Sequence, residues 1–173
     1  MNAIYTPLGH YVTVTGIAEC ITERLADTVG GVPNRVCIYP GDVAWDSCEC
    51  GMLALTTTRM YGSGSFPTLN ADFVIDCGIP YMVASLEITM LRCIPSLQDG
   101  KRPPTCAQLG NATQIQYEDA YAVWQGTLCC LKALRDNNFI QEFAMGAQVF
   151  TGPQGLCGGS VLSVDLGYLA GCC

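Results

Sequence analysis

Cysteine is the residue type with the most capacity for chemistry in this chain, which has twelve cysteines and one histidine among 173 residues. Zinc sites usually show paired Cys-x-x-Cys segments or Cys/His sets, and no two cysteines here have the Cys-x-x-Cys spacing. A disulfide scaffold is typical of shorter, exported chains. The chain opens Met-Asn-Ala-Ile-Tyr-Thr-Pro with no Lys or Arg before Arg24, so we expect it to be made in a cytoplasm and to hold no metal.

The contexts of the cysteines differ along the chain. Cys20 and Cys129-Cys130 adjoin apolar stripes, where a free cysteine acts as a small hydrophobic residue. Cys93 and Cys106 flank a 12-residue loop, and a disulfide closing it would contribute about 3 kcal/mol by loop entropy. They are the first candidate pair. The sequence leaves open any pairing among the cysteines in turn-rich stretches, Cys48, Cys50, Cys77 and Cys157.

No catalytic or cofactor-binding pattern is recognisable. His10 has no Ser or Cys motif near it, so we expect a hydrogen-bonded or exposed histidine instead of a base. The glycine-rich segments at 62–64 and 155–159 lack the spacing of phosphate-binding loops and predict turns. The loop carboxylates do not follow a calcium-loop pattern: Asp42, Asp46, Asp72 and Asp76.

The charge balance disfavours several classes of partner. A net charge of −7 without a Lys/Arg cluster is unsuited to specific nucleic-acid binding. The longest apolar stretches, such as 81–91, are far shorter than a membrane span of roughly 20 residues, so we expect no membrane association. Charged residues make up 13%, about half the usual share of roughly 25%, which indicates that much of the surface contacts other protein.

Hydrophobic periodicity predicts the element order α-β-β-β-α-β-β within a single domain, residues 1–173. The clearest segment starts at Pro80, where Met82, Ala84, Leu86, Ile88 and Met90 alternate with polar residues. Thr105 is a predicted N-cap, and Trp124 lies on the second helix's apolar stripe. The predicted elements are a helix at 13–29, strands at 35–39, 52–61 and 80–91, a helix at 105–138, and strands at 143–151 and 160–169.

Runs of strands with two helices predict an α+β fold, a mainly antiparallel sheet with both helices packed on one face. The other face would be hydrated or would line a channel. Its predicted residues are Ser85, Glu87, Thr89, Ser163 and Asp165. A long loop is expected at about 62–76, and a flexible C-terminus at Cys172-Cys173.

Several segments together resemble the small head-to-tail connector proteins of long-tailed (siphovirus-type) phages of actinobacteria, and within them most closely the tail terminator. The resemblance covers 9–169, with Trp45-Asp-Ser-Cys-Glu-Cys-Gly its most specific part. The segments are Val32-Pro-Asn-Arg-Val-Cys-Ile-Tyr-Pro-Gly-Asp-Val-Ala-Trp-Asp-Ser-Cys-Glu-Cys-Gly-Met-Leu, Asp76-Cys-Gly-Ile-Pro-Tyr, Leu91-Arg-Cys-Ile-Pro, Pro104-Thr-Cys-Ala, Asp119-Ala-Tyr-Ala-Val and Gly152-Pro-Gln-Gly-Leu-Cys-Gly-Gly.

The resemblance implies a structural virion protein with no enzymatic activity and no cofactor. Tail terminators are α+β proteins that form a ring, usually of six copies, which caps the tail tube, ends its polymerisation and joins tail to head. The implied partners are further copies of the chain, the tail tube protein and the neck or stopper protein below the portal. DNA would pass through the lumen, where negative charge would let the duplex slide.

A mobile polar loop with aromatic residues could order against the tube or a neighbouring subunit, so the candidate interface residues are Gly62, Ser63, Phe66, Leu69 and Phe73. We expect Cys93 and Cys106 to pair after release of the particle into oxidising surroundings. One alternative is another neck component, a stopper or head-completion protein. A second is a cytosolic redox or metal-binding module using Cys48-Glu-Cys50 and Cys77. An enzyme is the weakest alternative.

Overall fold

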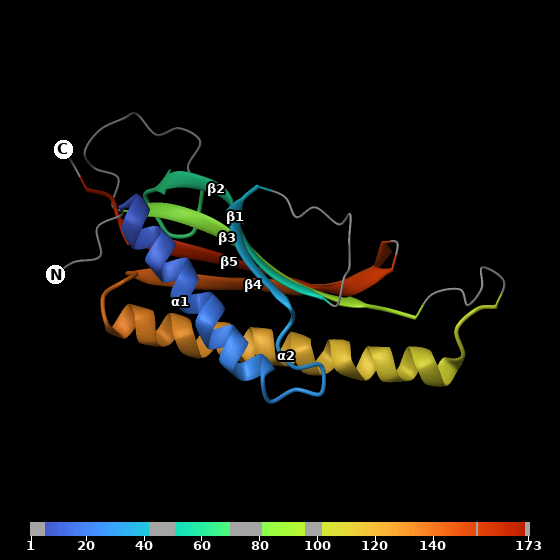
Figure 1. The fold of residues 1–173 in the computed structure, drawn as a ribbon. Helices are drawn as coiled ribbons and strands as arrows, with labels where there is room; N and C mark the ends of the chain where they lie inside the picture. Colours follow the sequence, from blue (N-terminus) through green and yellow to red (C-terminus); the bar gives the residue numbers. More distant parts are fainter. Residues whose placement is uncertain (1–5, 42–50, 70–80, 96–101, 155, 172–173) are drawn as a thin grey trace.

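The computed structural model describes residues 6–41, 51–69, 81–95, 102–154 and 156–171. The predicted element order is confirmed (Figure 1). The elements are α1 (Pro7–Leu25), β1 (Arg35–Pro40), β2 (Met52–Ser63), β3 (Tyr81–Cys93), α2 (Cys106–Asp136), β4 (Glu142–Gln154) and β5 (Cys157–Leu169).

The five strands form one sheet in the order β1-β2-β3-β5-β4. Three of its four strand pairs are antiparallel, whereas β1 runs parallel to β2, so the sheet is mixed. Both helices cover the same face of the sheet, as predicted, because one core cluster contains side chains from α1, α2 and the strands (Figure 1). The fold is therefore α+β.

Alternation along β3 and β5 separates the two sheet faces as the sequence predicted. Leu86 and Ile88 on β3 and Leu162 and Val164 on β5 are buried beneath the helices. Glu87, between the two β3 residues, is exposed on the other face. The prediction that this face is hydrated is wrong for Ser85 and Thr89, which are only 7% and 2% exposed. A period of two places successive side chains on opposite faces. The face away from the helices is partly buried as well, since Met52, Ala54 and Leu91 form a second core cluster there.

Helix α1 begins earlier than the sequence predicted. Thr6 is its N-cap, whose hydroxyl accepts a hydrogen bond from the Gly9 N–H (3.0 Å), and Pro7 fits the first helical position. Leu8 and Tyr11 in the first turns are exposed, so they do not extend the apolar stripe from which the prediction was made. The helix also ends sooner, at Leu25 instead of residue 29.

Helix α2 is continuous from Cys106 and does not break at Gly110. Its N-terminus is a capping box in which Thr105 and Gln108 bond reciprocally. The prediction that Trp124 belongs to the buried stripe is wrong: 40% of its side chain is exposed, because Val123 and Thr127 face the core in its place. Neither helix has the length and apolarity required to cross a bilayer, among the residues described.

Candidate functional site

A disulfide between Cys20 and Cys130 joins the two helices, with their Cα atoms 6.0 Å apart. The sequence prediction that both cysteines act as free hydrophobic residues is wrong. One turn before Cys130, Gly126 lets the helices approach closely, since a Cβ there would lie 3.1 Å from the Ile21 Cα. That approach brings two cysteines 110 residues apart in sequence into bonding range. Cys129, the next residue, is exposed and outside this bond.

No disulfide joins Cys93 to Cys106, and both side chains are exposed. The prediction concerned closure after particle release, so it stays a prediction. Cys157, which pairs with Cys93 in the β3–β5 register, is disulfide-bonded. The described cysteines thus take part in two disulfides that the sequence alone did not identify.

His10 is buried between α1 and the sheet. Its Nδ1 lies 2.9 Å from the Tyr168 hydroxyl and its Nε2 lies 3.0 Å from the Thr57 hydroxyl, so both ring nitrogens are hydrogen-bonded. Burial lowers the pKa of His10, which favours a neutral ring with one donating and one accepting nitrogen. This confirms the prediction of a hydrogen-bonded histidine. It joins α1 to β2 and β5.

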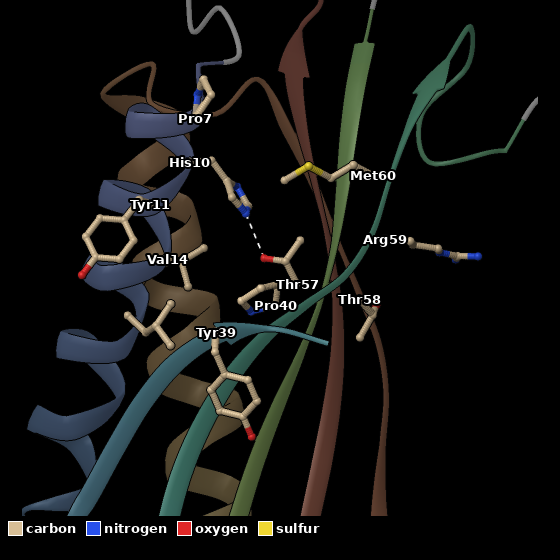
Figure 2. Close-up of a pocket in the computed structure, with 11 residues that line it drawn as sticks. Pro7, His10, Tyr11, Val14, Tyr39, Pro40, Thr57, Thr58, Arg59 and Met60 are labelled. Carbon is tan, nitrogen blue, oxygen red and sulfur yellow. Dashed lines mark hydrogen bonds between the residues drawn. The ribbon is translucent and has the colours of Figure 1, made fainter. Parts of the chain in front are cut away.

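A pocket of about 490 Å³ opens beside His10, between the first half of α1 and the strands β1 and β2 (Figure 2). In Figure 2, Met60 and His10 extend toward each other, whereas Arg59 points away from the helix. The pocket lies where β1 ends at Pro40 while β2 continues to Ser63. Its lining is mostly apolar: Pro7, His10, Tyr11, Val14, Ile38, Tyr39, Pro40, Thr57, Thr58, Arg59 and Met60.

The opposite face of the sheet carries a polar cluster centred on Ser85. Its hydroxyl donates to the Asp165 carboxylate and accepts from Arg59 Nε (3.1 Å), and the Arg59 guanidinium lies over the Tyr61 ring. Burial, followed by the Asp165 charge, raises the pKa of Tyr61. Ser85 has an acidic neighbour but no base, since His10 lies beneath α1 on the other face, so the cluster links β2, β3 and β5 without forming a nucleophile–base pair.

A buried ion pair closes the end of β3 against α2. Arg92 Nε donates to an Asp119 carboxylate oxygen (2.7 Å), and Asp119 also accepts from the Thr28 hydroxyl (3.1 Å). A second Arg92 nitrogen donates to the Gly31 carbonyl in the α1–β1 connection. Gly30 lies so close that a Cβ would be 2.8 Å from the Arg92 guanidinium. The pair therefore fixes three elements and is a structural feature.

The predicted interface loop begins later than expected. Gly62 and Ser63 belong to β2, and Ser63 is fully buried. The Ser63 hydroxyl donates to the Thr68 carbonyl (2.7 Å), and the Tyr61 hydroxyl donates to the Pro67 carbonyl (2.7 Å). These bonds fold 64–69 back onto the end of β2, so the start of the loop is part of the sheet's own packing.

The aromatic candidates in this loop have different surroundings. The Phe66 ring lies 6.0 Å from the Tyr81 ring and covers Gly167, where a Cβ would approach within 2.9 Å of it. Leu69 is exposed and remains available for a contact. Phe73 lies outside the described residues, as do Cys48, Cys50, Cys77, Cys172, Cys173 and the loop carboxylates Asp42, Asp46, Asp72 and Asp76.

Large apolar side chains are exposed along α2 and the sheet edge beside it. Tyr117, Tyr121 and Trp124 follow one another at steps of four and three residues, which places them on one helical face. The Phe150 ring on β4 meets the Tyr117 ring edge-on at 5.2 Å. The sequence did not predict this surface: of its residues only Trp124 was assigned to the apolar stripe, and it was expected to be buried. In the part of the chain that the structure describes, no three His, Cys, Asp or Glu residues are grouped to hold a metal ion.

Comparison with known proteins adds no assignment: no protein-family model matches the chain, and no curated protein matches it significantly.

Proposed function

We propose that the chain is a structural protein of the phage head–tail connector, the tail terminator, which forms a ring on the head-proximal end of the tail tube. Two independent lines support the proposal. The sequence segments resemble that class over 9–169, and the α+β order with both helices on one sheet face agrees with what the resemblance implies. A terminator works by closure, since a ring that matches the tube on one side only ends its growth.

The observation that carries the proposal is that both edge strands of the sheet have exposed apolar side chains. Strands β1 and β4 end the sheet on opposite sides and have no further strand beside them in the described residues. Open edges with exposed apolar side chains are surfaces for association. A chain with so few charged residues is suited to burying such edges in an assembly.

Part of the face opposite the helices is exposed and would line the channel that the proposal requires, whereas Ser85, Thr89 and Leu91 on the same face are buried. Glu87 and Ser163 are exposed there and Asp165 is partly exposed, while the one cation of the cluster, Arg59, is hydrogen-bonded to Ser85. Hydroxyl and carboxylate groups offer no neutralising contacts to phosphates. A duplex would therefore pass without being held, in keeping with the net charge of −7.

A cryo-EM map of the particle that contains this chain tests the proposal. We expect a ring of copies of the chain between the tail tube and the neck. Assembly without the chain should give heads and tails that stay separate, with tails longer than normal. A ring placed directly beneath the portal would assign the chain to the stopper class instead. Complete absence of the chain from purified particles would overturn the proposal.

The contact role of the loop can be tested without unfolding the protein. Deleting 62–69 would remove buried Ser63 and the Phe66 packing, so the exposed Leu69 is the better target. We expect Leu69→Glu to leave the melting temperature unchanged and to lower the yield of joined particles. Unchanged joining by this variant would remove Leu69 from the interface.

A further inference from the structure

The molecule carries two exposed apolar surfaces, one near each edge strand of the sheet. The first, the aromatic stripe, consists of Tyr117, Tyr121 and Trp124 on α2 and Phe150 on β4, with exposed fractions of 60%, 63%, 40% and 48%. None of the four is charged. The stripe meets β4 through the contact of Tyr117 with Phe150, and Tyr121 on the same helix also borders Asp27 and Thr28 beyond the end of α1.

The second surface, the edge pocket, is the cavity of about 490 Å³ at the β1 side of the sheet (Figure 2). Tyr11 and Met60 are exposed at its two walls, one from α1 and one from β2. Arg59 is the one charged side chain in its lining and points away from the helix. An apolar side chain entering the pocket would therefore desolvate little charge.

We propose that the aromatic stripe of one copy docks into the edge pocket of the next copy. This inference deepens the ring of the proposed function and depends on it. A contact between two different surfaces of the same chain is heterologous, and repeated contacts of that kind build a ring when the rotation closes. The stripe is apolar and the lining of the pocket is mostly apolar, so the two surfaces match in polarity.

The exposed aromatic area supplies about half of what such a contact needs. A whole aromatic side chain presents about 150–250 Å², so the stripe's exposed fractions correspond to roughly 300–500 Å². A standard interface buries about 800 Å² on each partner, and the neighbouring exposed Val149 with the open β4 edge contributes to the remainder. A second copy is the favoured occupant because this chain supplies both halves of the contact.

Two lysine variants test the contact on the full-length protein. The stripe variant carries Tyr117→Lys and Tyr121→Lys, and the pocket variant carries Tyr11→Lys and Met60→Lys; all four side chains are exposed. A matched control, Val29→Lys with Leu109→Lys, makes the same change in charge at exposed apolar positions outside both surfaces. Sedimentation velocity is measured with exposed thiols alkylated, so that no intermolecular disulfide holds copies together.

We expect the wild type and the control to form a closed oligomer, and each lysine variant alone to remain a monomer. An equimolar mixture of the two variants should form a complex of two chains and nothing larger. The reason is that the mixture contains one intact stripe and one intact pocket that match, and the outer surfaces of the resulting pair are both blocked. The mixture also demonstrates that each variant is folded.

Three results would overturn the proposal: a monomeric wild type, assembly of either variant as far as the wild type, or a mixture that stays monomeric. These results are separate from a failure of the proposed function. A wild-type ring built through these surfaces that does not cap tails would refute the terminator role and leave the contact intact. A ring that tolerates both variants would refute the contact alone.

Discussion

At the scale of single residues, the groups with the most capacity for chemistry hold the fold together. Asp119 is almost fully buried and accepts from both Arg92 and Thr28, while His10 is bonded at both ring nitrogens. A buried charge or imidazole without such partners would destabilise the protein by several kcal/mol. These residues therefore act on stability, and their removal should be measured as stability.

Asp119→Asn should lower the free energy of unfolding by about 3–5 kcal/mol, because it leaves the Arg92 guanidinium buried without its counter-charge. The control is Asp136→Asn in the exposed Arg135–Asp136 pair, whose N···O distance is 3.7 Å. Exposed pairs contribute about 0–1 kcal/mol, so the control should unfold almost as the wild type does. Equal losses in the two variants, measured by urea denaturation, would contradict a structural role for the buried pair.

His10 should make stability depend on pH below about 6.5, the ordinary pKa of an unfolded histidine. Because burial lowers the pKa of His10 in the folded chain, the unfolded chain binds a proton first as the pH falls. The free energy of unfolding should therefore decrease from pH 7 toward pH 5. His10→Gln keeps a neutral donor and acceptor and should flatten that slope. The same slope in both proteins would show that the folded His10 titrates normally.

At the scale of elements, the sequence correctly predicted the segments in which burial is periodic. It missed features that depend on a local cap or on contacts between distant residues. The alternation along 80–91 correctly predicted β3, since one face of that strand is buried under the helices. The start of α1 escaped prediction because its signal is the Thr6 cap with Pro7, while the nearby Tyr11 is exposed. Periodicity also placed Trp124 in the core, since it does not say how wide a buried stripe is.

The Cys20–Cys130 disulfide should stabilise the pairing of α1 with α2. For a closed loop of about 100 residues the loop-entropy model gives about 4.7 kcal/mol, and the measured effect of removing a native disulfide is typically 2–5 kcal/mol. We expect Cys130→Ser to lower the melting temperature of oxidised protein, and reduction to abolish that difference. Cys129→Ser, at the exposed neighbouring position, is the control and should have no effect.

A thiol count checks the same bond independently. Of twelve cysteines, two form this disulfide and Cys157 belongs to a second one, so two disulfides use four cysteines and oxidised protein should show at most eight thiols. A count of twelve in mature particles would mean that the helices are held by packing alone.

Close approach of the helices should make Gly126 intolerant of a side chain. A Cβ at Gly126 would lie 3.1 Å from the Ile21 Cα, whereas a Cβ at Gly110 on the same helix would meet nothing within 4 Å. We therefore expect Gly126→Val to destabilise the protein by about 1–3 kcal/mol through overpacking. Gly110→Val should be nearly neutral, since valine and glycine differ little in helix propensity. Equal melting temperatures for the two variants would refute close packing at Gly126.

At the scale of the whole molecule, the sites depend on contacts that no local pattern encodes. His10 meets Thr57 and Tyr168, 47 and 158 residues away, and these contacts could not be derived from spacing. The edge pocket arises because β1 stops at Pro40 while β2 continues, which is a property of strand pairing. Composition indicated that much of the surface contacts other protein, which stays a prediction, and the arrangement of the exposed apolar residues became visible only in the fold.

The net negative charge of the copies should oppose assembly, whereas burial of their apolar edges should favour it. The strength of self-association should therefore depend on the salt concentration. Each copy carries −7, so copies repel one another, whereas the aromatic stripe contributes no charge to the contact and the edge pocket has Arg59 as its one charged lining residue. The screening length falls from about 30 Å at 0.01 M salt to about 8 Å at 0.15 M. Raising the salt concentration should therefore strengthen self-association of the wild type, measured by sedimentation at fixed protein concentration. An assembly joined mainly by ion pairs would weaken over the same range, and that result would exclude an apolar contact between copies.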